Sequence, residues 1–159
     1  MKVFRIEREK YLNTTLSGIG ASMDDGNRWN SRFTRLVYTA ESRALALLEV
    51  AVHLDLGEDL PSDRFLVEID IPDDEKVQEI HLEDLPTNWN EHPPTSSTQA
   101  IGDDFVLQGA ALLLKVPSCI VPDEFNYLIN PHHIAMQRVR VCKTVVMGFD
   151  ARLNGIGKP

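Results

Sequence analysis

The sequence predicts a single α+β domain built from mixed, largely antiparallel sheets and a few helices. Its 159 residues, of which 43% are hydrophobic and 25% charged, suit one compact soluble domain. No internal repeat or linker divides the chain, so residues 1–159 are expected to form that domain, with the last few residues as a flexible tail. Segments with strand and helix patterns do not alternate as regular βαβ units, which favours an α+β fold over a doubly wound one.

The first half of the chain contains the strongest helix signal, at residues 41–54, where alanine and leucine dominate. Thr39 or Ser42 is expected to cap this helix. Residues 12–27 are rich in Gly, Ser, Thr, Asn and Asp and predict a loop. Strands are predicted in segments rich in β-branched and aromatic residues or with alternating polarity, at residues 1–6, 32–39, 64–71 and 76–82.

The second half of the chain has less regular patterns. In chain order we expect a long loop at 86–104, a helix at 103–114 capped by Asp103 or Asp104, a buried strand at 113–122 interrupted by Pro117, a turn-rich stretch at 123–133, one long or two short strands at 137–150, and a frayed tail at 151–159. Within the turn-rich stretch, Asn126 and Asn130 are expected to fix turns.

The charge balance and the cysteines restrict the function classes. The net charge of −8 repels nucleic-acid phosphates, so we expect no direct nucleic-acid binding. Cys119 and Cys142 lie in apolar runs and are predicted to be small buried thiols without a disulfide. The chain shows neither the apolar core of a signal peptide nor a run of ~18–20 apolar residues, so a cytoplasmic protein without a membrane segment is expected.

Several common site motifs are incomplete in this sequence. The stretch GIGASM at residues 18–23 starts like a dinucleotide loop, but Met23 stands where the third glycine belongs. Five histidines are scattered without metal-ligand spacing, and the adjacent His132 and His133 diverge, so no metal is predicted. Ser118 lacks the GxSxG context of a hydrolase nucleophile, although it suits a hydrogen-bond donor at a rigid, proline-framed strand end.

Two charged residues remain as candidates for chemistry. Arg28 and Trp29 stand side by side in a Gly/Asn turn, which indicates either an anion-binding arginine beside an aromatic wall or an arginine stacked on a structural tryptophan. Glu49 is the only charge in residues 44–52. Its carboxylate belongs either to a solvent-facing stripe of the helix or to a cleft, where desolvation raises its reactivity.

Four segments taken together resemble the RES domain family, which is named for an arginine, a glutamate and a serine. The matching residues are Arg28, Glu49 and Ser118, and the resemblance covers nearly the whole chain. The segments are RWN at 28–30, VYTAESRALALLEV at 37–50, GDDFVL at 102–107 and VPSCIVPDEFNYLINP at 116–131. The resemblance implies a fold similar to that of ADP-ribosyltransferases and a bacterial toxin that consumes NAD or transfers its ADP-ribose.

The resemblance also implies roles for individual residues. Glu49 would stabilise the oxocarbenium-like ribose that forms when the nicotinamide bond breaks. Arg28 would bind the NAD pyrophosphate, and Tyr38 would stack on nicotinamide or ribose. Ser118 would hydrogen-bond the ribose or the carboxamide. Asn30 would form the turn beside them and contribute to NAD binding, while Trp29 is interpreted as structural.

Three functions follow as hypotheses. The first is NAD degradation by hydrolysis or phosphorolysis, the second is mono-ADP-ribosylation of a host protein, and the third is an inactive protein-interaction module. The resemblance implies an Xre-type helix-turn-helix antitoxin that covers the active site, with a chain terminus inserted into it. A homodimer within a larger toxin–antitoxin complex is compatible with the same resemblance.

Overall fold

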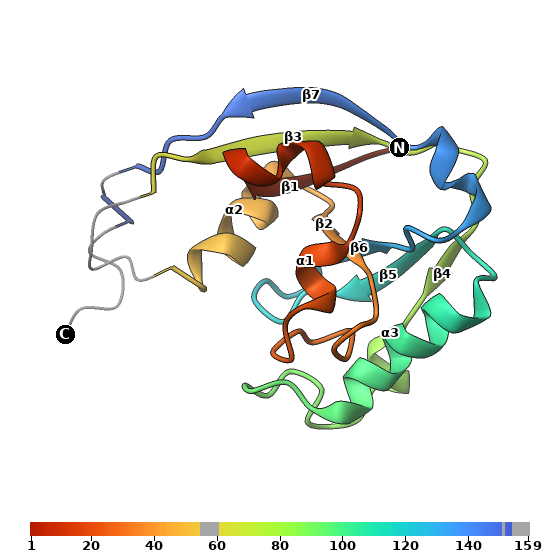
Figure 1. Ribbon diagram of the computed structural model, residues 1–159. Helices are drawn as coiled ribbons and strands as arrows, with labels where there is room; N and C mark the ends of the chain where they lie inside the picture. The colour runs from red at the N-terminus through yellow and green to blue at the C-terminus, as the bar shows by residue number, and fades with distance from the viewer. Residues whose placement is uncertain (55–60, 151, 154–159) are drawn as a thin grey trace.

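The computed structural model describes residues 1–54, 61–150 and 152–153. In these residues the chain forms one seven-stranded sheet with the order β4-β5-β6-β2-β1-β3-β7, shown in Figure 1. Its strands are β1 (Lys2–Arg8), β2 (Val37–Ala40), β3 (Arg64–Asp70), β4 (Val77–Glu79), β5 (Leu113–Pro117), β6 (Phe125–Ile129) and β7 (Arg140–Val146). Among the described strands only β4 and β5 pair in parallel, so the predicted mixed, largely antiparallel α+β fold is confirmed.

Short helices connect and cover these strands. The α-helices are α1 (Ile19–Ser22), α2 (Arg43–Ala51) and α3 (Ser96–Gln108), and the 3-10 helices are η1 (Glu9–Thr14), η2 (Leu82–Asp84) and η3 (Ile134–Arg138). At the start of α2 the Ser42 side chain accepts a 3.0 Å hydrogen bond from the backbone N–H of Leu45. The expected Ser42 cap is therefore confirmed, since this bond satisfies an N–H group that has no partner within the helix. Every helix of the described residues is too short or too polar to span a lipid bilayer.

Two separate coverings lie on one face of the sheet. At β1 and β2 the apolar side of α2 packs on the strands through Phe4, Ile6, Ala40, Leu45 and Ala46. At β5 and β6 the covering is α3 with residues 29–36, packed through Trp29, Leu36, Phe105, Leu114, Val116 and Leu128. The opposite face carries a third cluster, in which Val3, Val37, Val67, Ile69 and Ile129 are buried against Leu12, Leu16 and Met136. Strand β2 contributes to both coverings, with Ala40 under α2 and Tyr38 under the α3 covering.

The segment that precedes β2 is attached to α3 by close contacts. Asp103 accepts hydrogen bonds from the backbone N–H and the hydroxyl of Ser31, at 3.0 and 2.6 Å. One turn earlier, Gln99 donates to the carbonyls of Asp25 and Asn27. Gly102 lies so close to this segment that a Cβ atom would be 1.6 Å from the Trp29 carbonyl oxygen. The helix therefore fixes the position of the chain that leads to β2.

Two of the predicted elements in the second half are wrong. Helix α3 begins at Ser96, within the predicted loop 86–104, and ends before Gly109, whose φ is 58°. Asp103 is thus an interior residue that binds Ser31 rather than a cap. A Ser/Thr run favours a loop, yet such residues also open helices, and the contacts with residues 25–31 add stability that composition does not show. The stretch 123–133 contains a central strand, β6, in place of the predicted turns.

Smaller corrections concern the first half and the cysteines. The predicted strand at 32–39 is regular only from Val37, because Phe33 has a left-handed φ of 76° and turns the chain. The predicted loop at 12–27 contains the end of η1 and the whole of α1. Cys119 and Cys142 are both exposed rather than buried, the first in the turn after β5 and the second on the outermost strand. Most of the predicted tail lies outside the described residues.

Candidate active site

Glu49, on helix α2, accepts hydrogen bonds from Ser118 and Asn126. These residues lie at the seam, the line on the sheet where the α2 covering meets the α3 covering. One of its carboxylate oxygens, Oε1, accepts a 3.1 Å hydrogen bond from the Ser118 hydroxyl and a 2.5 Å hydrogen bond from the Asn126 amide. Glu49 and Asn126 are half-buried, and Ser118 is only 6% exposed. The structure therefore places Glu49 against the sheet rather than in the alternative solvent-facing stripe.

The local backbone explains why Ser118 donates to Glu49. Ser118 follows the last residue of β5, Pro117, and its own N–H donates to the Glu124 carbonyl at 2.9 Å. Its oxygen accepts hydrogen bonds from the backbone N–H groups of Ile120 and Val121, at 3.1 and 3.2 Å. With these bonds in place, the hydroxyl proton is directed at Glu49. The expectation of a hydrogen-bond donor at a rigid strand end fits this geometry.

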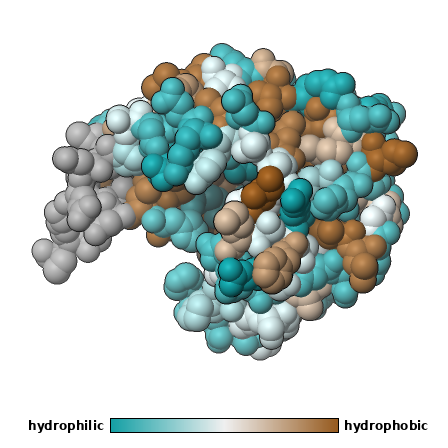
Figure 2. Space-filling view, in the orientation of Figure 1, coloured by the Kyte–Doolittle hydropathy of each residue, from teal (hydrophilic) through white to brown (hydrophobic). Residues whose placement is uncertain are grey.

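The position of Asn126 follows from the register of the sheet. Ala40 of β2 and Val116 of β5 both pair with Asn126, and Phe4 of β1 pairs with Ala40. These four side chains share a face, because directly paired residues point to the same side of a sheet. Phe4 and Ala40 lie under α2, whereas Val116 lies under the α3 covering. Asn126 is therefore a polar residue of the sheet at the boundary between the two coverings. Figure 2 shows an indentation in the surface of the molecule on this side.

Tyr38 lies one step farther along the same face. It pairs with Leu128, which puts it diagonal to Asn126 on the neighbouring strand. Its hydroxyl donates to the Asn30 side-chain oxygen at 2.7 Å and accepts from the Trp29 backbone N–H at 3.1 Å. Burial raises the pKa of Tyr38 above its ordinary value of 10, and the Trp29 N–H opposes that change. Tyr38 thus remains a neutral hydrogen-bonding side chain at physiological pH.

Asn30 is fully buried and does not reach the surface in this structure. Its amide group donates to the carbonyls of Ala21, Ser31 and Thr34, at 3.0 to 3.1 Å, and its oxygen is engaged by Tyr38. These bonds fit the expected turn-forming role. The expectation that Asn30 also contacts NAD meets a physical obstacle, because every polar atom of its side chain already has a protein partner.

Arg28 lies beyond Trp29 and contacts a different loop. Its Nη1 donates to the backbone carbonyls of Trp89 and Glu91, at 2.5 and 3.0 Å. Trp29 is 3% exposed and its ring stacks on Trp89, with centroids 6.3 Å apart and an interplanar angle of 30°. Trp29 is structural, as interpreted from the sequence, while Arg28 fastens the loop at Trp89. Arg28 makes no hydrogen bond to Glu49, Ser118 or Asn126 among the described residues.

Asn126 lies in strand β6 rather than in the predicted turn, and it is a site residue that the sequence does not predict. One signal for it was present: within FNYLI the asparagine alternates with Leu128 on the inward face, where an apolar residue is the rule. A lone amide at such a position needs a partner, and Glu49 supplies it. Asn130 does fix a turn, since its side-chain oxygen accepts from the His132 N–H at 2.9 Å. No group of three or more metal-ligating side chains is found in the described part of the chain.

Comparison with known proteins identifies the family. Residues 2–150 match the RES domain. The chain belongs to the RES domain family. Its relatives are named as toxins: a Prs ADP-ribosylating toxin from Sphingobium is 39% identical over 90% of this chain and 89% of its own length, and Toxin Res from Yersinia enterocolitica is 36% identical over 97% and 100%. The resemblance that rested on the four ordered segments is thereby confirmed at the level of the family.

A solved structure with the same fold extends this comparison. The M. tuberculosis MbcT–MbcA toxin–antitoxin complex contains a chain that matches 92% of this protein and 83% of its own length, with a TM-score of 0.74. The sequence identity is 18%, so this likeness concerns the fold alone. It places the RES protein described here in the same α+β architecture.

Proposed function

We propose that this RES protein is the toxin of a toxin–antitoxin pair and that it cleaves the bond between nicotinamide and ribose in NAD. The observation that carries the proposal is the pair of hydrogen bonds from Ser118 and Asn126 to a single oxygen of Glu49. This arrangement orients the carboxylate, and its second oxygen, which has no hydrogen-bond partner within the described residues, is left for a substrate. The family membership and the names of the relatives support a toxin that acts on NAD.

The chemistry assigns the central role to Glu49. When the nicotinamide leaves with the electron pair of the C–N bond, positive charge develops on the ribose ring. A carboxylate fixed beside that carbon stabilises the charge in the transition state without reorganising. An acceptor oxygen then bonds to the ribose carbon. Water gives ADP-ribose and releases a proton, and phosphate gives ADP-ribose carrying a 1″-phosphate.

The remaining candidates serve substrate binding in this proposal. Arg28 uses Nη1 for the Trp89 and Glu91 carbonyls, and its Nη2 and Nε groups face no protein acceptor among the described residues. These two groups form the planar edge that binds a pyrophosphate. Tyr38 offers an aromatic face next to Asn126 for nicotinamide or ribose. Asn30 contributes by holding the Tyr38 hydroxyl.

A second candidate reaction uses the same bond cleavage with a protein side chain as the acceptor. The name of the Sphingobium relative, an ADP-ribosylating toxin, favours it. In that case Glu49 keeps its role, and the target protein replaces water or phosphate. The alternative without catalysis is an inactive protein-interaction module. It predicts that replacing Glu49 does not change how fast NAD is consumed.

The proposed partner is an antitoxin of the Xre helix-turn-helix type that covers the seam at Glu49 and inserts a chain terminus there. The antitoxin would carry the DNA-binding function, since the net charge of −8 disfavours DNA contact by the toxin. A cytoplasmic location in a bacterium and a homodimer within the complex belong to the same proposal.

Nicotinamide release from NAD by the purified chain tests the proposed reaction. The native protein, Glu49→Gln and the exposed control Glu83→Gln are each assayed with and without phosphate. We expect release by the native protein and Glu83→Gln, and a loss of at least about a hundredfold for Glu49→Gln. A dependence on phosphate would indicate phosphorolysis. Full activity of Glu49→Gln would refute the mechanism.

Incubation of the toxin with labelled NAD in a lysate of sensitive bacteria distinguishes protein ADP-ribosylation from NAD degradation. Transfer of labelled ADP-ribose to a discrete protein, with little free nicotinamide from the isolated toxin, would establish protein modification as the main reaction. Free ADP-ribose or its phosphate, without a labelled protein, would establish NAD degradation. If neither occurs, the interaction-module hypothesis replaces both.

A further inference from the structure

The strand β7 forms an open edge of the sheet. Within the part of the chain that the structure describes, it pairs with β3 alone, and all seven of its residues are exposed. In Figure 1 it runs along the top of the molecule, and no other helix or strand of the described chain lies beyond it. An open edge presents unpaired N–H and C=O groups in the spacing that another strand requires. Such an edge can accept an extended segment of another protein.

The pairing of β7 with β3 limits the usable part of this edge. Lys143 pairs with Glu68, but the next pair along β3 joins Ile69 to Val141, so Cys142 is an extra residue in a bulge. A bulge interrupts the row of hydrogen-bonding groups. The continuous part of the edge is therefore 143–146, where Val145 and Val146 are 38% and 70% exposed. These valines offer apolar contacts on both faces of an added strand.

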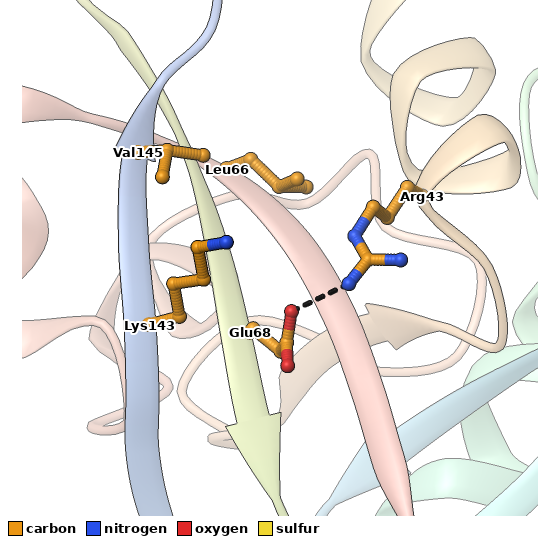
Figure 3. A pocket seen from close by; sticks show the side chains of 5 residues that line it. All are labelled: Arg43, Leu66, Glu68, Lys143 and Val145. Atoms are coloured by element: carbon orange, nitrogen blue, oxygen red, sulfur yellow. Dashed lines mark hydrogen bonds and ion pairs between the residues drawn. The ribbon is translucent and has the colours of Figure 1, made fainter.

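A small cavity adjoins this part of the edge, as Figure 3 shows. It has a volume of about 30 Å³ and is lined by Arg43, Leu66, Glu68, Lys143 and Val145. Both oxygens of Glu68 are already engaged, Oε1 by the Lys2 ammonium and Oε2 by Arg43 at 2.6 Å. Lys143 makes no ion pair within the described residues. The cavity thus holds a neutralised carboxylate and a lysine that remains for an incoming anion.

We propose that β7 is a docking strand for an extended acidic segment of a partner protein. The segment adds to the sheet alongside residues 143–146 and places a carboxylate on Lys143. Charge supports this occupant, because Arg140 and Lys143 give the edge a positive character in a chain whose net charge is −8. This proposal is independent of the reaction at Glu49.

A second copy of this chain fits the edge less well. When the continuous part of the edge, residues 143–146, pairs antiparallel with the same residues of a second copy, Lys143 lies opposite Val146 and neither lysine receives a carboxylate. An acidic segment meets the same lysine with the opposite sign, which distinguishes the two occupants.

Peptide binding to the full chain tests the charge preference. The probe is a fluorescent, end-capped heptapeptide in which valine alternates with glutamate, and its control replaces glutamate with lysine. We expect the glutamate peptide to bind at least about tenfold more tightly by fluorescence anisotropy. Lys143→Glu should remove or reverse this preference, and Lys143→Gln should weaken it. Lys76→Glu, an exposed lysine outside the edge, should leave it unchanged.

Hydrogen exchange tests the mode of binding. If the peptide adds as a strand, amide exchange in β7 slows on binding, and no comparable slowing occurs in β4 at the other edge. Equal binding of the two peptides, or no slowing in β7, would overturn the proposal. Self-association of the peptide-free chain that Lys143→Glu abolishes would also overturn it, because the edge would then serve a second copy.

Discussion

The Asn126 amide lies 2.5 Å from the same Glu49 oxygen that accepts the Ser118 hydroxyl. Replacement of Asn126 by aspartate therefore brings two carboxyl groups together, and they must share a proton. While the shared proton is present, the introduced carboxyl group can still donate to Glu49. We expect nicotinamide release by Asn126→Asp to rise as the pH falls from 9 to 5, relative to the native protein.

The folding stability of the same variant should follow the proton. The pair has a higher pKa in the folded state than in the unfolded state, so the folded state binds more protons and stability falls as the pH rises. Urea unfolding at pH 5 and pH 8 measures this, with exposed Asn90→Asp as the matched control. Parallel behaviour of the two variants would show that Asn126 and Glu49 are not coupled.

Tyr38→Phe should destabilise the chain without introducing a new charge. Loss of the hydroxyl leaves the Asn30 oxygen and the Trp29 N–H without their partner, and both residues are buried. An unsatisfied buried polar group costs about 1–3 kcal/mol, so the free energy of unfolding should fall by that amount. Urea titration measures the loss. Tyr11→Phe, where the ring is 47% exposed, should change little, and equal effects would contradict the assignment.

The sequence predicted the parts of the fold that depend on local pattern. The helix at α2 and its Ser42 cap, the strands β1, β3, β5 and β7, and the α+β class all followed from periodicity and composition. The assignment of Glu49 and Ser118 to one site came from the family resemblance, and their hydrogen bond was not predicted, since 69 residues separate them in the chain. No local pattern reports a contact over that distance.

The failures have a common physical origin in tertiary contacts. β6 is a strand although asparagine disfavours strands, because its position between β2 and β5 satisfies the backbone and Glu49 satisfies Asn126. α3 starts in a Ser/Thr run because Gln99, Gly102 and Asp103 are held against residues 25–31. Cys142 is exposed because β7 is an edge, which depends on the order of strands.

Arg28→Ala should raise the KM for NAD by about tenfold or more and change kcat less, because a lost pyrophosphate contact is made in both ground and transition states. Arg28→Lys should recover only part of the loss, since lysine lacks the planar fork. Steady-state kinetics of nicotinamide release measure both. Arg35→Ala, an exposed arginine of the same segment, should behave as native. An unchanged KM in Arg28→Ala would restrict Arg28 to holding the loop at Trp89.

Glu68→Gln should give a stability loss that depends on pH. Hydrogen bonds from Lys2 and Arg43 lower the pKa of Glu68 from its ordinary value of 4.5 to about 2. The ionised carboxylate therefore stabilises the folded state fully above pH 4.5, and this contribution disappears as the pH falls toward 2. Thermal unfolding should show a constant difference from the native protein near neutral pH that narrows below pH 4.5. Exposed Glu83→Gln should show no such difference, and a gap that persists at pH 2 would contradict the ion-pair assignment.

Gly102→Ala should be among the most destabilising small substitutions in the chain. An added Cβ atom would lie 1.6 Å from the Trp29 carbonyl oxygen and 3.2 Å from the Leu36 side chain, so α3 must move away from the segment that leads to β2. Forced overpacking of this kind costs about 1–3 kcal/mol or more. Because the same segment carries Arg28 and Asn30, NAD turnover should fall together with the urea midpoint. Gly20→Ala is the matched control, since its Cβ would meet nothing within 4 Å, and an equally mild effect of both substitutions would show that α3 and residue 29 are not in firm contact.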